Sequence, residues 1–107
     1  MKRILQVFLG VVMLTGINLS AKELKVLTIG NSFADSVFVY LPAIAEAENS
    51  PLILERANLP GCSLQRHWEL AERSESDPEL KPYKGRNLRE MLTLEEWDVV
   101  TLQQASP

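Results

Sequence analysis

The chain has 107 residues, 46% of them hydrophobic, and a formal net charge of −3 at pH 7. A chain of this length has room for one small domain at most. Its acidic balance argues against binding to nucleic acid or to an anionic membrane, because both would repel it. The single cysteine, Cys62, excludes an internal disulfide, so we expect a buried thiol that packs like a small apolar side chain.

Residues 1–21 have the pattern of a secretory signal peptide. Lys2 and Arg3 precede an apolar run over residues 4–14, and mostly small or polar residues follow up to Ala21. The run is shorter than the ~20 apolar residues of a membrane-spanning helix, which is the alternative. We therefore predict a secreted or periplasmic protein without membrane association after cleavage. Without Lys2 and Arg3, nine basic side chains remain against fourteen acidic ones, a formal charge of −5.

Residues 22–107 alternate between strand and helix patterns. A short apolar run at 24–29 (LKVLTI) predicts a buried strand that ends at Gly30. Two further strands are predicted at 52–57 (LILERA) and 98–102 (DVVTL). The last of these is apolar, and nothing that follows it in these 107 residues would cover its faces, which predicts an incomplete domain.

A first helix is predicted between the first two strands. Pro42 fits the first turn of this helix, which continues to Glu48. A second helix is predicted over residues 64–73, with Ser63 as its N-cap. Its apolar stripe is Leu64, Trp68 and Ala71, so Trp68 is expected to pack against the core.

A third, short helix is predicted around Leu88 and Leu92, after a polar loop over residues 74–85. Thr93 and Glu96 have the spacing of a capping box, which predicts one further helical turn. Strands and helices in this order predict an α/β fold with a parallel sheet and helices on both faces.

The carboxyl ends of parallel strands are where ligands bind in open α/β sheets. Here these ends are residues 30–32 (GNS), 59–62 (LPGC) and 103–104 (QQ). We expect the three loops to meet at one edge of the sheet and to form the functional site.

The chemistry of these loops suits acyl transfer. Ser32 follows the first strand, and a serine hydroxyl becomes a nucleophile when a base accepts its proton. The backbone N–H groups of Ser32 and Gly61, with a carboxamide from Gln103 or Gln104, would stabilise an oxyanion. The alternative is that Ser32 only caps the next helix. Residues 30–34 also approximate the nucleophile elbow of an α/β-hydrolase. That elbow normally follows a mid-sheet strand after several earlier strands, whereas residues 30–34 follow the first predicted strand.

Three segments carry a family resemblance: residues 26–33 (VLTIGNSF), 61–68 (GCSLQRHW) and 97–106 (WDVVTLQQAS). Together they resemble the opening half of an SGNH/GDSL-type hydrolase, most closely an uncharacterised branch known as a domain of unknown function. The resemblance implies a flavodoxin-like three-layer sheet, Ser32 as the nucleophile, and the Ser32 and Gly61 backbones as oxyanion donors. It also implies hydrolysis of a small-molecule ester, commonly an acylated carbohydrate or lipid, without a cofactor.

The chain departs from the family pattern at three points. Asn31 stands where the family usually has Asp, and Gln103 and Gln104 stand where it has Asn, with Gln104 favoured as the donor. No Asp-x-x-His motif occurs in the 107 residues, so Ser32 lacks the base that the family uses. We therefore expect residues 22–107 to be the N-terminal part of a hydrolase that is inactive alone. A non-catalytic binding module, or an inactive remnant, is the alternative.

His67 is the single histidine and lies about one helical turn beyond Gly61. Since nothing in the sequence brings it to Ser32, we expect it to line the substrate site or orient the loop rather than act as the base. His67 and Cys62 are too few ligands for zinc, so no metal site is predicted.

Overall fold

Three apolar segments pair as one parallel sheet. The computed structural model describes residues 22–106. β2 (Leu24–Gly30) is the central strand, β3 (Leu52–Asn58) pairs with one of its edges and β4 (Val99–Leu102) with the other. The three predicted strands and their parallel order are confirmed. The predicted signal peptide, residues 1–21, lies outside the described residues.

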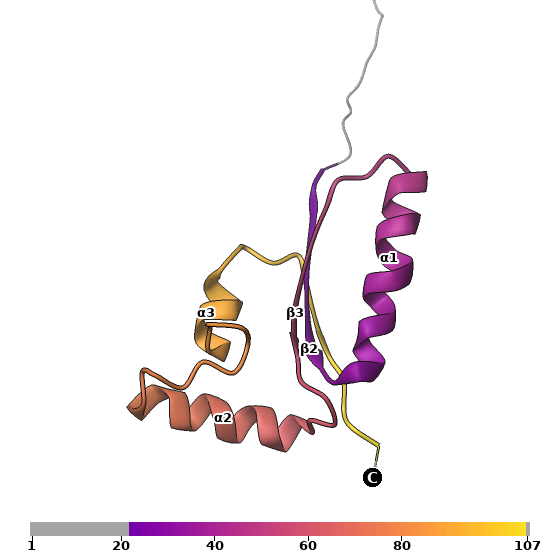
Figure 1. Ribbon diagram of the computed structural model, residues 1–107. Helices are drawn as coiled ribbons and strands as arrows, with labels where there is room; N and C mark the ends of the chain where they lie inside the picture. Colours follow the sequence, from indigo (N-terminus) through magenta and orange to yellow (C-terminus); the bar gives the residue numbers. More distant parts are fainter. Residues whose placement is uncertain (1–21, 107) are drawn as a thin grey trace, which may run out of the picture.

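Helices cover both faces of the sheet, as the order of elements predicted. α1 (Ser36–Ala47) lies against one face, and α2 (Leu64–Ser76) and α3 (Leu88–Thr93) lie on the other (Figure 1). The fold is therefore of the general α/β class. In the part of the chain that the structure describes, no helix combines the length and the apolar character needed to cross a membrane.

The predicted start of the first helix is wrong. A 3-10 helix, η1 (Ser32–Asp35), continues directly into α1, so the helical segment begins before Pro42 and contains it. A proline inside a helix cannot donate its backbone hydrogen bond to the residue four positions earlier, which here is Phe38.

The predicted buried face of the second helix is also wrong. Ser63 caps α2 as expected, accepting a hydrogen bond from Arg66 N at 3.1 Å. The buried residues, however, are His67, Leu70 and Ser74, whereas Trp68 is 63% exposed. The apolar stripe pointed to the wrong side of the helix because two of the buried residues are polar.

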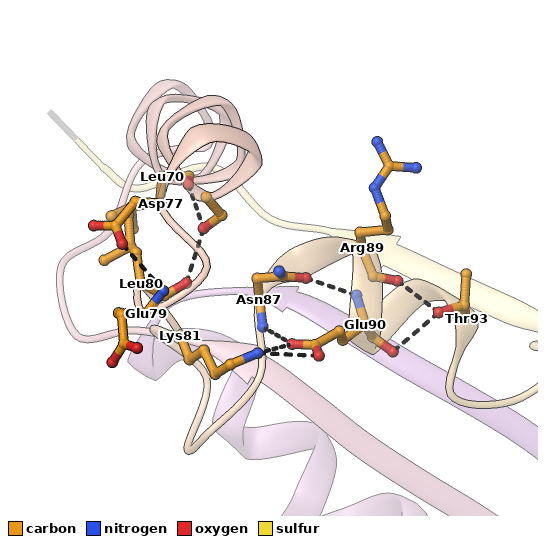
Figure 2. Close-up of polar contacts among 10 residues, drawn as sticks. Leu70, Asp77, Glu79, Leu80, Lys81, Asn87, Arg89, Glu90 and Thr93 are labelled. Carbon is orange, nitrogen blue, oxygen red and sulfur yellow. Dashed lines mark hydrogen bonds and ion pairs between the residues drawn. The ribbon is translucent and has the colours of Figure 1, made fainter.

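The capping box of α3 lies earlier in the chain than the sequence predicted. The Asn87 side chain accepts from Glu90 N at 2.9 Å, and the Glu90 carboxylate accepts from Asn87 N at 2.9 Å. Figure 2 shows this reciprocal pair, together with Lys81, whose ammonium group donates to the same carboxylate. Thr93 ends α3 instead of starting another turn.

The core lies between the sheet and the α2–α3 side of the molecule. Its buried side chains come from the strands, from α3 and from the loop before α3, and Cys62 is also buried, as predicted. By contrast, Leu102 of the edge strand β4 is 66% exposed. The cluster consists of Leu27, Ile29, Ala57, Tyr83 and Met91, with Leu59, Leu88 and Trp97 packed against it.

Candidate functional site

The end of β2 is built for close approach of a neighbouring loop. A Cβ atom on Gly30 would lie 2.8 Å from Gln103 Oε1 and 3.2 Å from Ala34 Cβ. Gln103 itself is held beside β2, because its backbone N–H donates to Ile29 O at 2.9 Å. Glycine at position 30 therefore lets the loop after β4 lie directly against the loop after β2.

Asn31 joins all three strand ends. It is 2% exposed, its side-chain amide donates to Cys62 O at 3.3 Å, and its backbone N–H donates to Gln103 Oε1 at 3.2 Å. Its side-chain oxygen accepts from Phe33 N at 3.0 Å. An aspartate could accept the Phe33 bond but could not donate to the Cys62 carbonyl. Asparagine at position 31 thus has a structural role, which is to connect the first loop to the second.

Ser32 has no structural task at this junction. The residue that caps η1 is Asn31, so the interpretation of Ser32 as the cap is wrong. Ser32 is exposed. Among the described residues its hydroxyl and its backbone N–H take part in no hydrogen bond outside the helix, and no histidine or carboxylate contacts its hydroxyl. The hydroxyl is therefore free to react but is not activated by any residue in this range.

Gly61 supplies an exposed backbone N–H in the second loop. Its φ of +65° lies in the left-handed region, which favours glycine. A Cβ there would meet nothing within 4 Å, so the backbone angle, not space, explains the glycine. Within residues 22–106 the Gly61 N–H has no acceptor, whereas the next N–H, from Cys62, donates to Leu59 O at 3.1 Å.

The two glutamines have different neighbours. Gln103 is partly buried and contacts the backbone of Asn31, the residue before Ser32. Gln104 is exposed, and its side-chain oxygen accepts from Leu64 N at 3.0 Å, at the start of α2. The structure thus places Gln103 nearer the serine loop and Gln104 nearer the loop that carries Gly61.

His67 is buried in a structural network. Its Nε2 lies 2.7 Å from Gly30 O and its Nδ1 lies 2.7 Å from Tyr83 Oη, and the side chains of His67 and Tyr83 are only 2% and 5% exposed. A carbonyl oxygen can only accept, so Nε2 carries a proton; in the neutral ring with this tautomer, Nδ1 accepts from the Tyr83 hydroxyl. Burial raises the pKa of Tyr83 to about 12, which keeps this hydroxyl a donor. His67 therefore orients the loop at the end of β2, which is one of the two roles that the sequence predicted for it.

The network was not visible in the sequence because Tyr83 lies in a loop far from His67 along the chain.

Burial also raises the pKa of the Cys62 thiol, which keeps it protonated. No cluster of three metal-ligating side chains occurs in the described range. Four hollows in that range have linings that do not include Ser32, Gly61 or Gln104.

Fold and site together define an α/β protein with a polar junction at the carboxyl edge of a parallel sheet. A scan against protein-family models and searches of curated proteins and of solved structures found no match to this chain.

Proposed function

We propose that the chain carries the nucleophile, Ser32, and the oxyanion donors of an SGNH-type acyl-ester hydrolase, without a base for Ser32 among residues 22–106. The observation that carries this proposal is the Asn31 junction, which holds the loops of Ser32, Gly61 and Gln103 together through direct hydrogen bonds. The flavodoxin-like architecture that the resemblance implies is part of the same proposal.

The free groups at the junction suit the chemistry of acyl transfer. Ser32 Oγ would attack the acyl carbon, and the carbonyl oxygen would become an oxyanion. The N–H groups of Ser32 and Gly61 have no protein acceptor among the described residues, so they are available to that oxyanion. A glutamine carboxamide would be a third donor, from Gln103 or Gln104. The alcohol then leaves with a proton, and water releases the acid from the serine ester.

The test uses methylboronic acid, which forms a tetrahedral adduct with a serine hydroxyl and so resembles the oxyanion. We expect saturable changes in the NMR amide signals of Ser32 and Gly61 at the same concentrations. Ser32→Ala should abolish both changes, whereas Ser36→Ala, which alters a serine four residues later in the chain, should keep them. Identical changes in the Ser32→Ala variant, or a response of Ser32 without Gly61, would refute the proposal.

A second candidate function is a non-catalytic binding module that keeps the fold without turnover. The observation that favours it is the engagement of His67, whose two ring nitrogens are already bonded to Gly30 and Tyr83. On this proposal the junction binds an ester or acid ligand but forms no bond to Ser32. Methylboronic acid separates the two candidates, since only a reactive serine forms the adduct.

We also propose that the protein is exported to the periplasm or the extracellular space. The support is the pattern of residues 1–21, with two basic residues before a short apolar run.

The acidic balance of the chain supports a small-molecule partner rather than nucleic acid. The partner that the resemblance favours is an ester of a carbohydrate or a lipid.

A further inference from the structure

A hollow lies along the outer edge of β3. This hollow, which we call the β3-edge hollow, has a volume of about 690 Å³ and is bounded by β3, the start of the Gly61 loop and the loop between α2 and α3. Its apolar lining includes Phe38, Leu54, Leu59 and Met91. Ser32, Gly61 and the two glutamines do not line it, so the hollow is a different site from the proposed esterase site.

Three cationic side chains surround the β3-edge hollow: Arg56, Lys84 and Arg86. Glu55 is the one acidic residue in the lining. Such a concentration of positive charge is unusual in a chain whose formal net charge is −3. Within residues 22–106, neither Lys84 nor Arg86 forms an ion pair. Arg56 is paired with Asp35, so the positive charge that can attract an anion comes mainly from Lys84 and Arg86.

The turn that presents Lys84 and Arg86 is fixed at both ends. Tyr83 N donates to Arg86 O at 2.9 Å, and the left-handed φ angles of Lys84 (53°) and Gly85 (91°) close the turn. On either side of it, Lys81 Nζ and Asn87 N each donate to Glu90 Oε1 at 2.9 Å, as Figure 2 shows. The cations are therefore carried by an ordered turn, which lowers the entropy cost of binding a ligand.

Arg56 is also held in place. Its guanidinium carbon lies 3.7 Å from the centre of the Phe38 ring, and its Nη1 donates to Asp35 Oδ1 at 3.2 Å. A guanidinium group has five N–H donors, and in the described structure only this one is used for a side-chain partner. The remaining donors can bind a planar or tetrahedral oxyanion, which is the group that arginine recognises best.

We propose that the β3-edge hollow binds a small organic anion, with its acidic group among Arg56, Lys84 and Arg86 and its apolar body against Phe38, Leu59 and Met91. The acidic group is a phosphate, sulfate or carboxylate. The apolar wall favours an organic anion over an inorganic one, because an inorganic anion has no apolar group to pack against it.

Phenyl phosphate is the probe, titrated into the full chain while amide chemical shifts are recorded. We expect saturable shifts at residues 83–86 and 56–60. Lys84→Gln combined with Arg86→Gln should weaken binding about tenfold, the factor expected from losing two exposed charge contacts. Lys22→Gln combined with Arg73→Gln changes the net charge equally at exposed positions outside the hollow and should leave the affinity unchanged.

Three further arms test the chemistry of the ligand. Inorganic phosphate, which lacks the apolar body, and phenol, which lacks the charge, should each bind much more weakly than phenyl phosphate. Glu55→Gln should tighten binding of phenyl phosphate, because it removes the one negative charge in the lining. Equal affinity for inorganic phosphate or phenol, equal affinity in the Lys84/Arg86 variant, or the absence of saturable shifts would overturn the proposal.

Discussion

The Ser32 hydroxyl should be the most reactive hydroxyl of the chain, so Ser32→Ala should abolish the fast acetylation. In wild type treated with p-nitrophenyl acetate, with imidazole as external base, we expect Ser32 to be acetylated about 100-fold faster than Ser36, which lies on the same segment. The reason is that an oxyanion formed at Ser32 would be stabilised by two free N–H groups, whereas one formed at Ser36 would not. Peptide mass spectrometry after a timed quench measures both rates.

Imidazole is needed because no residue among 22–106 contacts the Ser32 hydroxyl as a base. Without imidazole we expect no Ser32-dependent hydrolysis of a small acetyl ester above the Ser32→Ala background. Ser36→Ala is the matched control and should leave acetylation of Ser32 unchanged. Similar acetylation rates at Ser32 and Ser36 would contradict an oxyanion site at the junction, and rapid turnover without imidazole would return His67 to consideration as the base.

His67→Phe should destabilise the domain by about 2–4 kcal/mol. The substitution keeps an aromatic ring on α2 but leaves the buried Tyr83 hydroxyl without its acceptor and removes one of the two donors to Gly30 O, the other being Leu59 N at 3.1 Å. A buried polar group without a partner costs more than the average hydrogen bond contributes. The free energy of unfolding from urea titration measures the loss.

Two further variants assign this loss to the network. Tyr83→Phe, which removes only the hydroxyl, should cost about 1 kcal/mol, and the double variant should cost less than the sum of the two. Gln65→Ala, at an exposed position on the same helix, should change stability by about 0.5 kcal/mol or less. Additive effects of His67→Phe and Tyr83→Phe would show that the two side chains are not coupled.

The strands and their convergence could be predicted from the sequence because both depend on local pattern. Short apolar runs bounded by Gly30 and by the Asn58–Gly61 turn mark the strands, and alternation with helices makes the sheet parallel. The carboxyl ends of such strands lie at one edge whatever the details of packing. Asn31 lies at this edge, directly after β2, and its contacts with Cys62 and Gln103 were seen only in the structure.

The errors arose where tertiary contacts override local preference. Apolar spacing placed Trp68 on the buried side of α2, but His67 and Ser74 occupy that side because each finds hydrogen-bond partners there. For Ser74 these are the carbonyls of Leu70 and Leu80. Gly30, Tyr83 and Leu80 lie outside the helix, so these partners of His67 and Ser74 leave no periodic signal.

The helix boundaries failed for a related reason. Proline statistics favour the first helical turn, yet Pro42 lies inside α1 because the helix continues from η1, which Asn31 caps. Similarly, Thr93 and Glu96 match the spacing of a capping box, but Asn87 and Glu90 form it.

The convergence of the three strand ends is tested most directly by nuclear Overhauser contacts in solution. We expect cross-peaks between the Asn31 side-chain amide protons and protons of Cys62, and between Gly30 Hα and the Gln103 side chain. Contacts between paired residues of β2 and β3, such as Val26 and Leu54, serve as the internal control for a folded sheet. A spectrum that shows the β2–β3 cross-peaks but lacks both the Asn31–Cys62 and the Gly30–Gln103 cross-peaks would contradict a shared site.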